Sequence, residues 1–134
     1  MTYLLDDFTD ADVVARRWRV FSDRVLGGVS VARAEVATVA GAARFGGLQL
    51  TVCGVPGSYF VHLRSADTRS PRQYYAAPLP VTASSQTVSL PWRTFIPASL
   101  KAPLDPSTLQ RIGIVAGQAA FAADIAIGRL GLVP

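Results

Sequence analysis

The sequence predicts an all-β domain in which two antiparallel sheets face each other as a sandwich. Hydrophobic residues make up 50% and charged residues 16% of the 134 residues, which supplies one apolar core and excludes a disordered chain. Apolar and polar residues alternate in several short runs, the pattern of half-buried strands. Nine prolines and eleven glycines divide the chain into short elements, and no helices alternate with the strands as a parallel sheet requires. We therefore expect one domain over residues 1–134.

The N-terminal segment is the one place where a helix is expected. In residues 10–18, Asp10 is a suitable N-cap, and Asp12 and Arg16 form a favourable pair four residues apart. The segment predicts a helix of about two turns.

The strands are expected from residue 30 onward, where the hydrophobic period changes to two. The alternating runs are 48–53, 59–64, 88–90, 112–114 and 121–128. The sequence Gly-Val-Pro-Gly at 54–57 is a turn signal, so residues 48–64 are expected to form a hairpin. The proline-rich segment 101–108 predicts a long loop, because proline cannot donate a ladder hydrogen bond.

Charge and cysteine content exclude several classes of protein. The net charge is +4, but the basic residues are scattered apart from Arg16, Arg17 and Arg19, so nucleic-acid binding is not expected. Cys53 is the single cysteine, which rules out an intramolecular disulfide and a thiolate metal site. Cys53 is interpreted as a small strand residue. No apolar run is long enough to span a membrane. The acidic N-terminus does not resemble a secretory signal, so a cytoplasmic location is expected.

The sequence predicts neither a catalytic site nor a cofactor. His62 is the single histidine, and no serine lies in a G-x-S-x-G elbow. A small hydrolase is therefore the least favoured class. The N-terminal acidic residues do not have the spacing of an EF-hand loop. They are interpreted as solvated turn carboxylates, one of which caps a helix, and the alternative is that they bind a structural calcium ion. These residues are Asp6, Asp7, Asp10 and Asp12.

Residues 18–30, Trp-Arg-Val-Phe-Ser-Asp-Arg-Val-Leu-Gly-Gly-Val-Ser, are the most distinctive part of the chain. Asp23 is expected to accept backbone N–H bonds and fix a turn, and the Gly27–Gly28 pair permits positive φ or a close backbone approach. No Gly-Lys-Ser/Thr follows, so this is not a phosphate loop. The expected structural motif consists of Trp18, Ser22, Asp23, Gly27, Gly28 and Ser30.

This motif resembles that of the complex I intermediate-associated proteins, which are assembly factors for NADH dehydrogenase. Three further segments are similar to that family in the same order, residues 54–64, 87–97 and 112–125, with Tyr75 opening a strand. The resemblance implies a galactose-binding-like jelly roll of two antiparallel sheets. Residues 31–47 lack the family's Gly-Gly-Phe-x-Ser segment, so the chain resembles a shortened bacterial member. The missing segment is expected to leave an open sheet edge, through which two copies of the chain could form a homodimer.

The leading functional hypothesis is a non-catalytic binding module of the assembly-factor type with a protein partner. The alternative is a carbohydrate-binding module of jelly-roll type, in which Tyr75 is expected to contact the sugar, because aromatic and arginine side chains recognise sugar or peptide groups. The candidate binding residues are Asp23, Arg64, Tyr74, Tyr75, Trp92 and Arg93.

Overall fold

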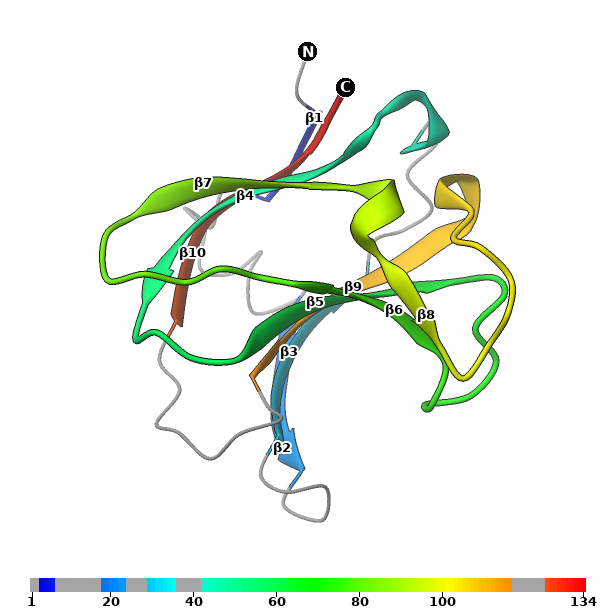
Figure 1. The fold of residues 1–134 in the computed structure, drawn as a ribbon, viewed down its shortest axis with the longest axis horizontal. Helices are drawn as coiled ribbons and strands as arrows, with labels where there is room; N and C mark the ends of the chain where they lie inside the picture. The colour runs from blue at the N-terminus through cyan, green and yellow to red at the C-terminus, as the bar shows by residue number, and fades with distance from the viewer. Residues whose placement is uncertain (1–2, 7–17, 24–28, 36–41, 117–124) are drawn as a thin grey trace.

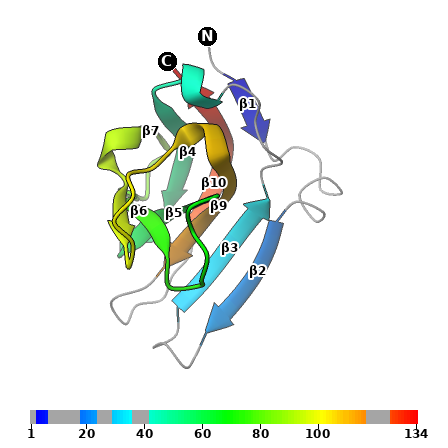
Figure 2. The same ribbon diagram turned by 90° about the vertical axis from the view of Figure 1, so that its right-hand side faces the viewer.

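The computed structural model describes residues 3–6, 18–23, 29–35, 42–116 and 125–134, the first three segments through their backbone pairing. They form two facing antiparallel sheets (Figures 1 and 2), which confirms the predicted fold class. The strands are β1 (Tyr3–Asp6), β2 (Trp18–Asp23), β3 (Val29–Glu35), β4 (Gly47–Gly54), β5 (Tyr59–Ser65), β6 (Tyr74–Pro78), β7 (Gln86–Pro91), β8 (Ile96–Ala98), β9 (Leu109–Ala116) and β10 (Ile125–Val133).

Helical structure in the described residues is limited to three single 3₁₀ turns. These are η1 (Ala42–Arg44), η2 (Trp92–Thr94) and η3 (Pro106–Thr108). Most of the predicted helix, residues 10–17, lies outside the described residues. Its last residue, Trp18, begins strand β2 instead. Within the described segments, no helix has the length and apolar character needed to cross a membrane.

One sheet has four strands in the order β1-β10-β4-β7, and the other has six in the order β2-β3-β9-β5-β6-β8. The predicted hairpin over residues 48–64 is therefore wrong, because β4 and β5 lie in different sheets. Their turn carries the chain from one sheet to the other, and the Tyr59 hydroxyl donates to the Val55 carbonyl at 2.8 Å within it. Alternation predicts a strand but does not identify its partner.

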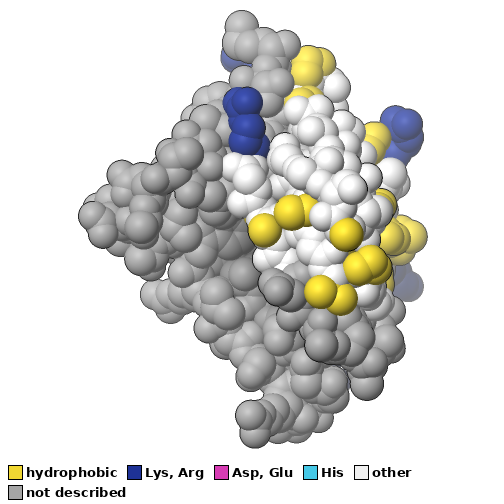
Figure 3. Space-filling model, turned by 90° about the vertical axis from the view of Figure 1, so that its left-hand side faces the viewer, with side chains coloured by type: hydrophobic (Ala, Val, Ile, Leu, Met, Phe, Trp, Pro, Cys, Tyr) yellow, Lys and Arg dark blue, Asp and Glu magenta, His cyan; other side chains and the backbone are white. Residues whose placement is uncertain are grey.

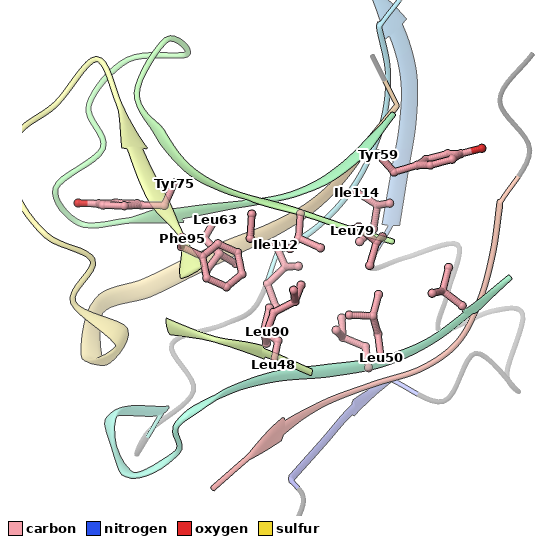
Figure 4. Packing of buried hydrophobic residues seen from close by; sticks show 14 of the residues in the cluster. Leu48, Leu50, Tyr59, Leu63, Tyr75, Leu79, Leu90, Phe95, Ile112 and Ile114 are labelled. Carbon is pink, nitrogen blue, oxygen red and sulfur yellow. The ribbon is translucent and has the colours of Figure 1, made fainter. Parts of the chain in front are cut away.

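The core lies between the sheets and is filled by the alternate residues of each strand. The inward side chains of β4 are Leu48, Leu50 and Val52, and those of β9 include Ile112 and Ile114. Figure 4 shows Leu48 and Leu50 of one sheet facing Ile112 and Ile114 of the other. The other residues of each central strand point outward, so each sheet presents an outer face to solvent.

The last predicted strand is displaced along the chain. Residues 121–124 lie outside the described residues, and β10 runs instead over Ile125–Val133. Its second half pairs Leu130 with Leu50 and Leu132 with Leu48 on β4, and the register shifts between Ile127 and Arg129. This bulge realigns the inward side chains of β10, which hydrophobic period alone does not predict.

Candidate functional site

The centre of the six-stranded sheet presents aromatic and basic side chains on its outer face. Along β5, Phe60, His62 and Arg64 alternate with the fully buried Val61 and Leu63 and are half-buried themselves. In the register, His62 lies between Gly113 on β9 and Ala76 on β6. Both directly opposed residues are small, which leaves room over His62 for a ring from a diagonal position.

Tyr74 on β6 completes a row of rings with Phe60 and His62, which we call the aromatic row. The His62 and Tyr74 rings are stacked, with centroids 4.1 Å apart and planes 10° apart. The Phe60 and His62 rings are 6.4 Å apart and tilted by 52°. Tyr74 is half-buried and has Ala98 opposite it on β8. The row therefore offers polarisable ring surface on a rigid sheet.

Arg64 fastens the loop that borders the aromatic row. Its Nη1 donates to the Ser70 carbonyl at 3.2 Å, and its Nη2 donates to the Pro71 carbonyl at 2.9 Å. The backbone N–H of Arg69 in turn donates to Gln73 Oε1 at 2.8 Å. Arg64 thus belongs to the candidate site, but two of its donors hold the loop 66–73 in place.

Tyr75 does not lie on this surface, which corrects its assignment as a sugar-contacting residue. Its side chain is 0% exposed and packs in the core, at the opposite end from Tyr59 (Figure 4). Its hydroxyl donates to the carbonyls of Ala102, at 2.8 Å, and Pro103, at 3.3 Å. Neighbouring strand residues point to opposite faces, so Tyr74 and Tyr75 have different roles.

The burial of Tyr75 raises the pKa of its phenol above the ordinary value of 10.0. The carboxylate of Asp67 raises this pKa further, a hydrogen bond with Ser65 lowers it, and Asp105 adds a smaller rise. Loss of a proton would place a negative charge in the core, where it is poorly solvated.

We expect the free energy of unfolding to fall as the pH rises above 10, partly through Tyr75. The folded protein keeps the phenol proton at a pH where the unfolded chain releases it. The stabilisation that Tyr75 contributes is therefore complete below pH 10, and it is lost as the pH rises through the raised pKa of the folded state. Urea unfolding between about pH 8 and about pH 11 measures the slope. Tyr75→Phe should flatten the slope, and an identical slope in both proteins would contradict this assignment.

Trp92 and Arg93 lie in η2, which links β7 of the four-stranded sheet to β8 of the six-stranded sheet. The Trp92 indole N–H donates to the Phe45 carbonyl at 2.7 Å, and its ring is 6.3 Å from that of Phe95. Trp92 is half-buried and packs against the core, while Arg93 is exposed. The structure does not bring this pair into the aromatic row.

The N-terminal motif lies in the β2–β3 pair at the far edge of the same sheet. Ser22 is opposite Ser30, Asp23 is opposite Val29, and Trp18 is opposite Ala34. Gly27 and Gly28 lie outside the described residues, so the turn-fixing role of Asp23 stays a prediction. Its contribution to binding also stays a prediction.

Sequence reasoning did not select Phe60 or His62 as binding residues. The alternation already put both on one strand face with Arg64, but it could not show that Tyr74 stacks on His62. That contact depends on the β5–β6 register, which places residues 12 positions apart side by side. In the described part of the chain, no group of three or more His, Cys, Asp or Glu side chains is arranged to hold a metal ion.

No protein-family model matches the sequence, and a search of curated proteins found no match either. Several solved structures do match over nearly the whole chain. One is the family 11 carbohydrate-binding module of a cellulosomal cellulase of Clostridium thermocellum, with 11% identity, a TM-score of 0.78, and coverage of 99% of this chain and 94% of that one. Another is a family 11 module from Clostridium thermocellum in complex with a β-1,3-1,4-mixed-linked tetrasaccharide, with 11% identity, a TM-score of 0.73, and coverage of 98% and 95%.

These findings overturn the expected membership of the complex I intermediate-associated family, and with it the leading hypothesis of an assembly factor with a protein partner. The matched positions have a structural explanation here: Tyr75 and Leu90 fill the core, and Tyr59 secures a turn between the sheets. These residues therefore serve the packing and turns of this sandwich, which carries no family-specific function. The chain has the two-sheet β-sandwich fold of the family 11 carbohydrate-binding modules.

Proposed function

We propose that the chain is a non-catalytic carbohydrate-binding module and that the aromatic row binds a β-linked glucan chain. The observation that carries this proposal is the stacked pair of His62 and Tyr74, half-exposed on the outer face of a rigid sheet. Function is argued from this site, because a shared fold alone supports many functions.

The chemistry of the row suits a sugar ring. The C–H face of a pyranose is apolar and packs on an aromatic face, while its hydroxyl groups need polar partners at the rim. Tyr74 contributes a phenol group, His62 two ring nitrogens, and Arg64 a guanidinium. Because the rings stand on paired strands, little conformational entropy is lost when a ligand binds.

The comparison with solved structures supports the choice of glucan. A module of the same fold, matched over 98% of this chain, forms a complex with a β-1,3-1,4-mixed-linked tetrasaccharide. A mixed-linked glucan is therefore the first ligand to test.

Replacing Tyr74 with alanine is expected to weaken binding of a mixed-linked tetrasaccharide by at least about tenfold, since ring stacking is lost. Isothermal titration calorimetry on the purified chain measures the dissociation constant. Tyr74→Phe keeps the ring and should retain most of the affinity. Thr87→Ala, at an exposed position on β7 of the other sheet, should bind like the parent.

Each outcome bears on the proposal. If the parent chain binds no glucan at millimolar concentration, carbohydrate binding fails. If the parent binds and Tyr74→Ala binds equally well, the ligand does not use the aromatic row. Thermal unfolding of each variant checks that the affinities are measured on folded protein.

A further inference from the structure

Basic side chains strongly outnumber acidic ones in residues 42–116 and 125–134, the segments whose side chains the structure describes. On the face in Figure 3, the charged side chains visible among these residues are Lys and Arg. The basic residues are Arg44, Arg64, Arg69, Arg72, Arg93, Lys101, Arg111 and Arg129, and the acidic ones are Asp67 and Asp105. The described side chains therefore carry a net positive charge.

Three of the basic residues lie on two loops that the fold joins at one end of the sandwich (Figure 1). We call residues 66–73 and 99–108 the loop platform. Gln73 Nε2 donates to the Ser99 carbonyl at 3.2 Å, and the Ala66 N–H donates to the Thr108 carbonyl at 3.2 Å. The buried Tyr75 hydroxyl holds the second loop from below. The platform carries the exposed side chains of Arg69, Arg72 and Lys101.

The acidic residues of the platform offset only part of this charge. The Asp105 carboxylate accepts from the Ser107 N–H at 3.0 Å and from the Ser107 hydroxyl at 2.6 Å, so it is already used to cap η3. Asp67 is the other acidic residue of the platform. The platform therefore has three cationic side chains and two carboxylates, which leaves it with one net positive charge.

The same sign continues onto the sheet beside the aromatic row. Arg64 on β5 lies directly opposite Arg111 on β9 in the register. Glu35 occupies the register position opposite Arg111 on its other side. Tyr74 directly follows the loop 66–73 in the chain. Arg64 of the neighbouring strand β5 holds this loop through the Ser70 and Pro71 carbonyls, so the loop that carries Arg69 and Arg72 borders the aromatic row.

Building on the proposed function, we infer that the bound polysaccharide carries carboxylates, as a uronic-acid-containing β-linked chain does. Tyr74 stacks on the sugar ring, while Arg69 and Arg72 bind carboxylate groups of the same chain. Guanidinium groups form paired hydrogen bonds with carboxylates, a geometry that lysine does not offer. The Arg64 hydrogen bonds to Ser70 and Pro71 fix the segment between the two arginines, which lowers the entropy cost of holding them ready.

A matched pair of ligands tests this inference: mixed-linked β-glucan oligosaccharides and the same oligosaccharides oxidised to carboxylates at C6. At about 50 mM NaCl, the oxidised ligand should bind the parent chain about tenfold more tightly, and the difference should shrink at about 500 mM NaCl. The double variant Arg69→Gln/Arg72→Gln should lose this preference and keep its affinity for the neutral ligand. Arg129→Gln, on β10 of the other sheet, is the control for loss of a distant positive charge.

The outcomes separate the two proposals. If neither ligand binds, the proposed function fails and the inference fails with it. If the neutral ligand binds and the oxidised one binds no more tightly, the inference alone fails. Equal losses in Arg129→Gln and in single Arg69→Gln or Arg72→Gln variants would also overturn it, as would equally tight binding of duplex DNA, because both results indicate attraction to charge alone.

Discussion

Replacing Tyr75 with alanine is expected to lower the free energy of unfolding by roughly 3–5 kcal/mol. The side chain is 0% exposed, so the substitution leaves a cavity the size of an aromatic ring. It also removes the donor to the Ala102 and Pro103 carbonyls, which fastens the loop 99–108 to the core. Urea unfolding monitored by tryptophan fluorescence measures the loss.

Two neighbouring variants make this prediction specific. Tyr75→Phe keeps the ring and loses the hydroxyl, so it should cost roughly 1–2 kcal/mol. Tyr74→Ala removes the adjacent ring from the half-exposed face and should cost less than Tyr75→Ala. Equal destabilisation at positions 74 and 75 would contradict the orientation of β6. A loss of sugar binding in Tyr75→Ala would report unfolding and not a lost sugar contact.

The second large effect is expected at Gly47, the first residue of β4. A Cβ atom built there would overlap the Leu90 carbonyl oxygen and lie 2.7 Å from Pro91 Cα, both in the backbone of the neighbouring strand β7. Backbone atoms in a ladder cannot move aside without breaking the β4–β7 pairing. Gly47→Ala should therefore cost roughly 3 kcal/mol.

Gly128→Ala is the matched control, because it adds the same methyl group to a strand of the same sheet. Its Cβ would lie 3.7 Å from Thr51 Cβ, an ordinary contact. We expect its stability to stay within about 0.5 kcal/mol of the parent or to rise slightly. A shift in thermal midpoint of the same size in both variants would show that lost glycine flexibility, and not overlap with β7, causes the effect.

The candidate site was only partly predictable. Arg64 and Tyr74 were selected from the sequence, and the structure brings them to the same face, with Phe60 and His62 added by the register. The sequence Tyr-Tyr-Ala-Ala-Pro of β6 has no apolar–polar alternation, so nothing in it tells which tyrosine is buried. Trp92 was selected for its ring, but its indole N–H donates to the Phe45 carbonyl, 47 residues away in the sequence, a contact that the sequence does not reveal.

Homodimerisation through an open edge and a cytoplasmic location stay predictions. The outermost strands of the two sheets are β1 and β7 in one and β2 and β8 in the other. The shortening expected in residues 31–47 falls partly on residues 36–41, outside the described part of the chain. Strand β3, which ends just before residues 36–41, is an inner strand, because it pairs with both β2 and β9.

The sequence by itself determined the all-β class and the buried face of the central strands, because strand geometry turns a two-residue period directly into an inside and an outside. Only the tertiary structure decided that β4 and β5 belong to different sheets, that Tyr74 meets His62, and that the loops 66–73 and 99–108 join into one basic platform. Periodicity depends on adjacent residues alone. Strand order and loop contacts depend on how distant segments share one core, which no local pattern encodes.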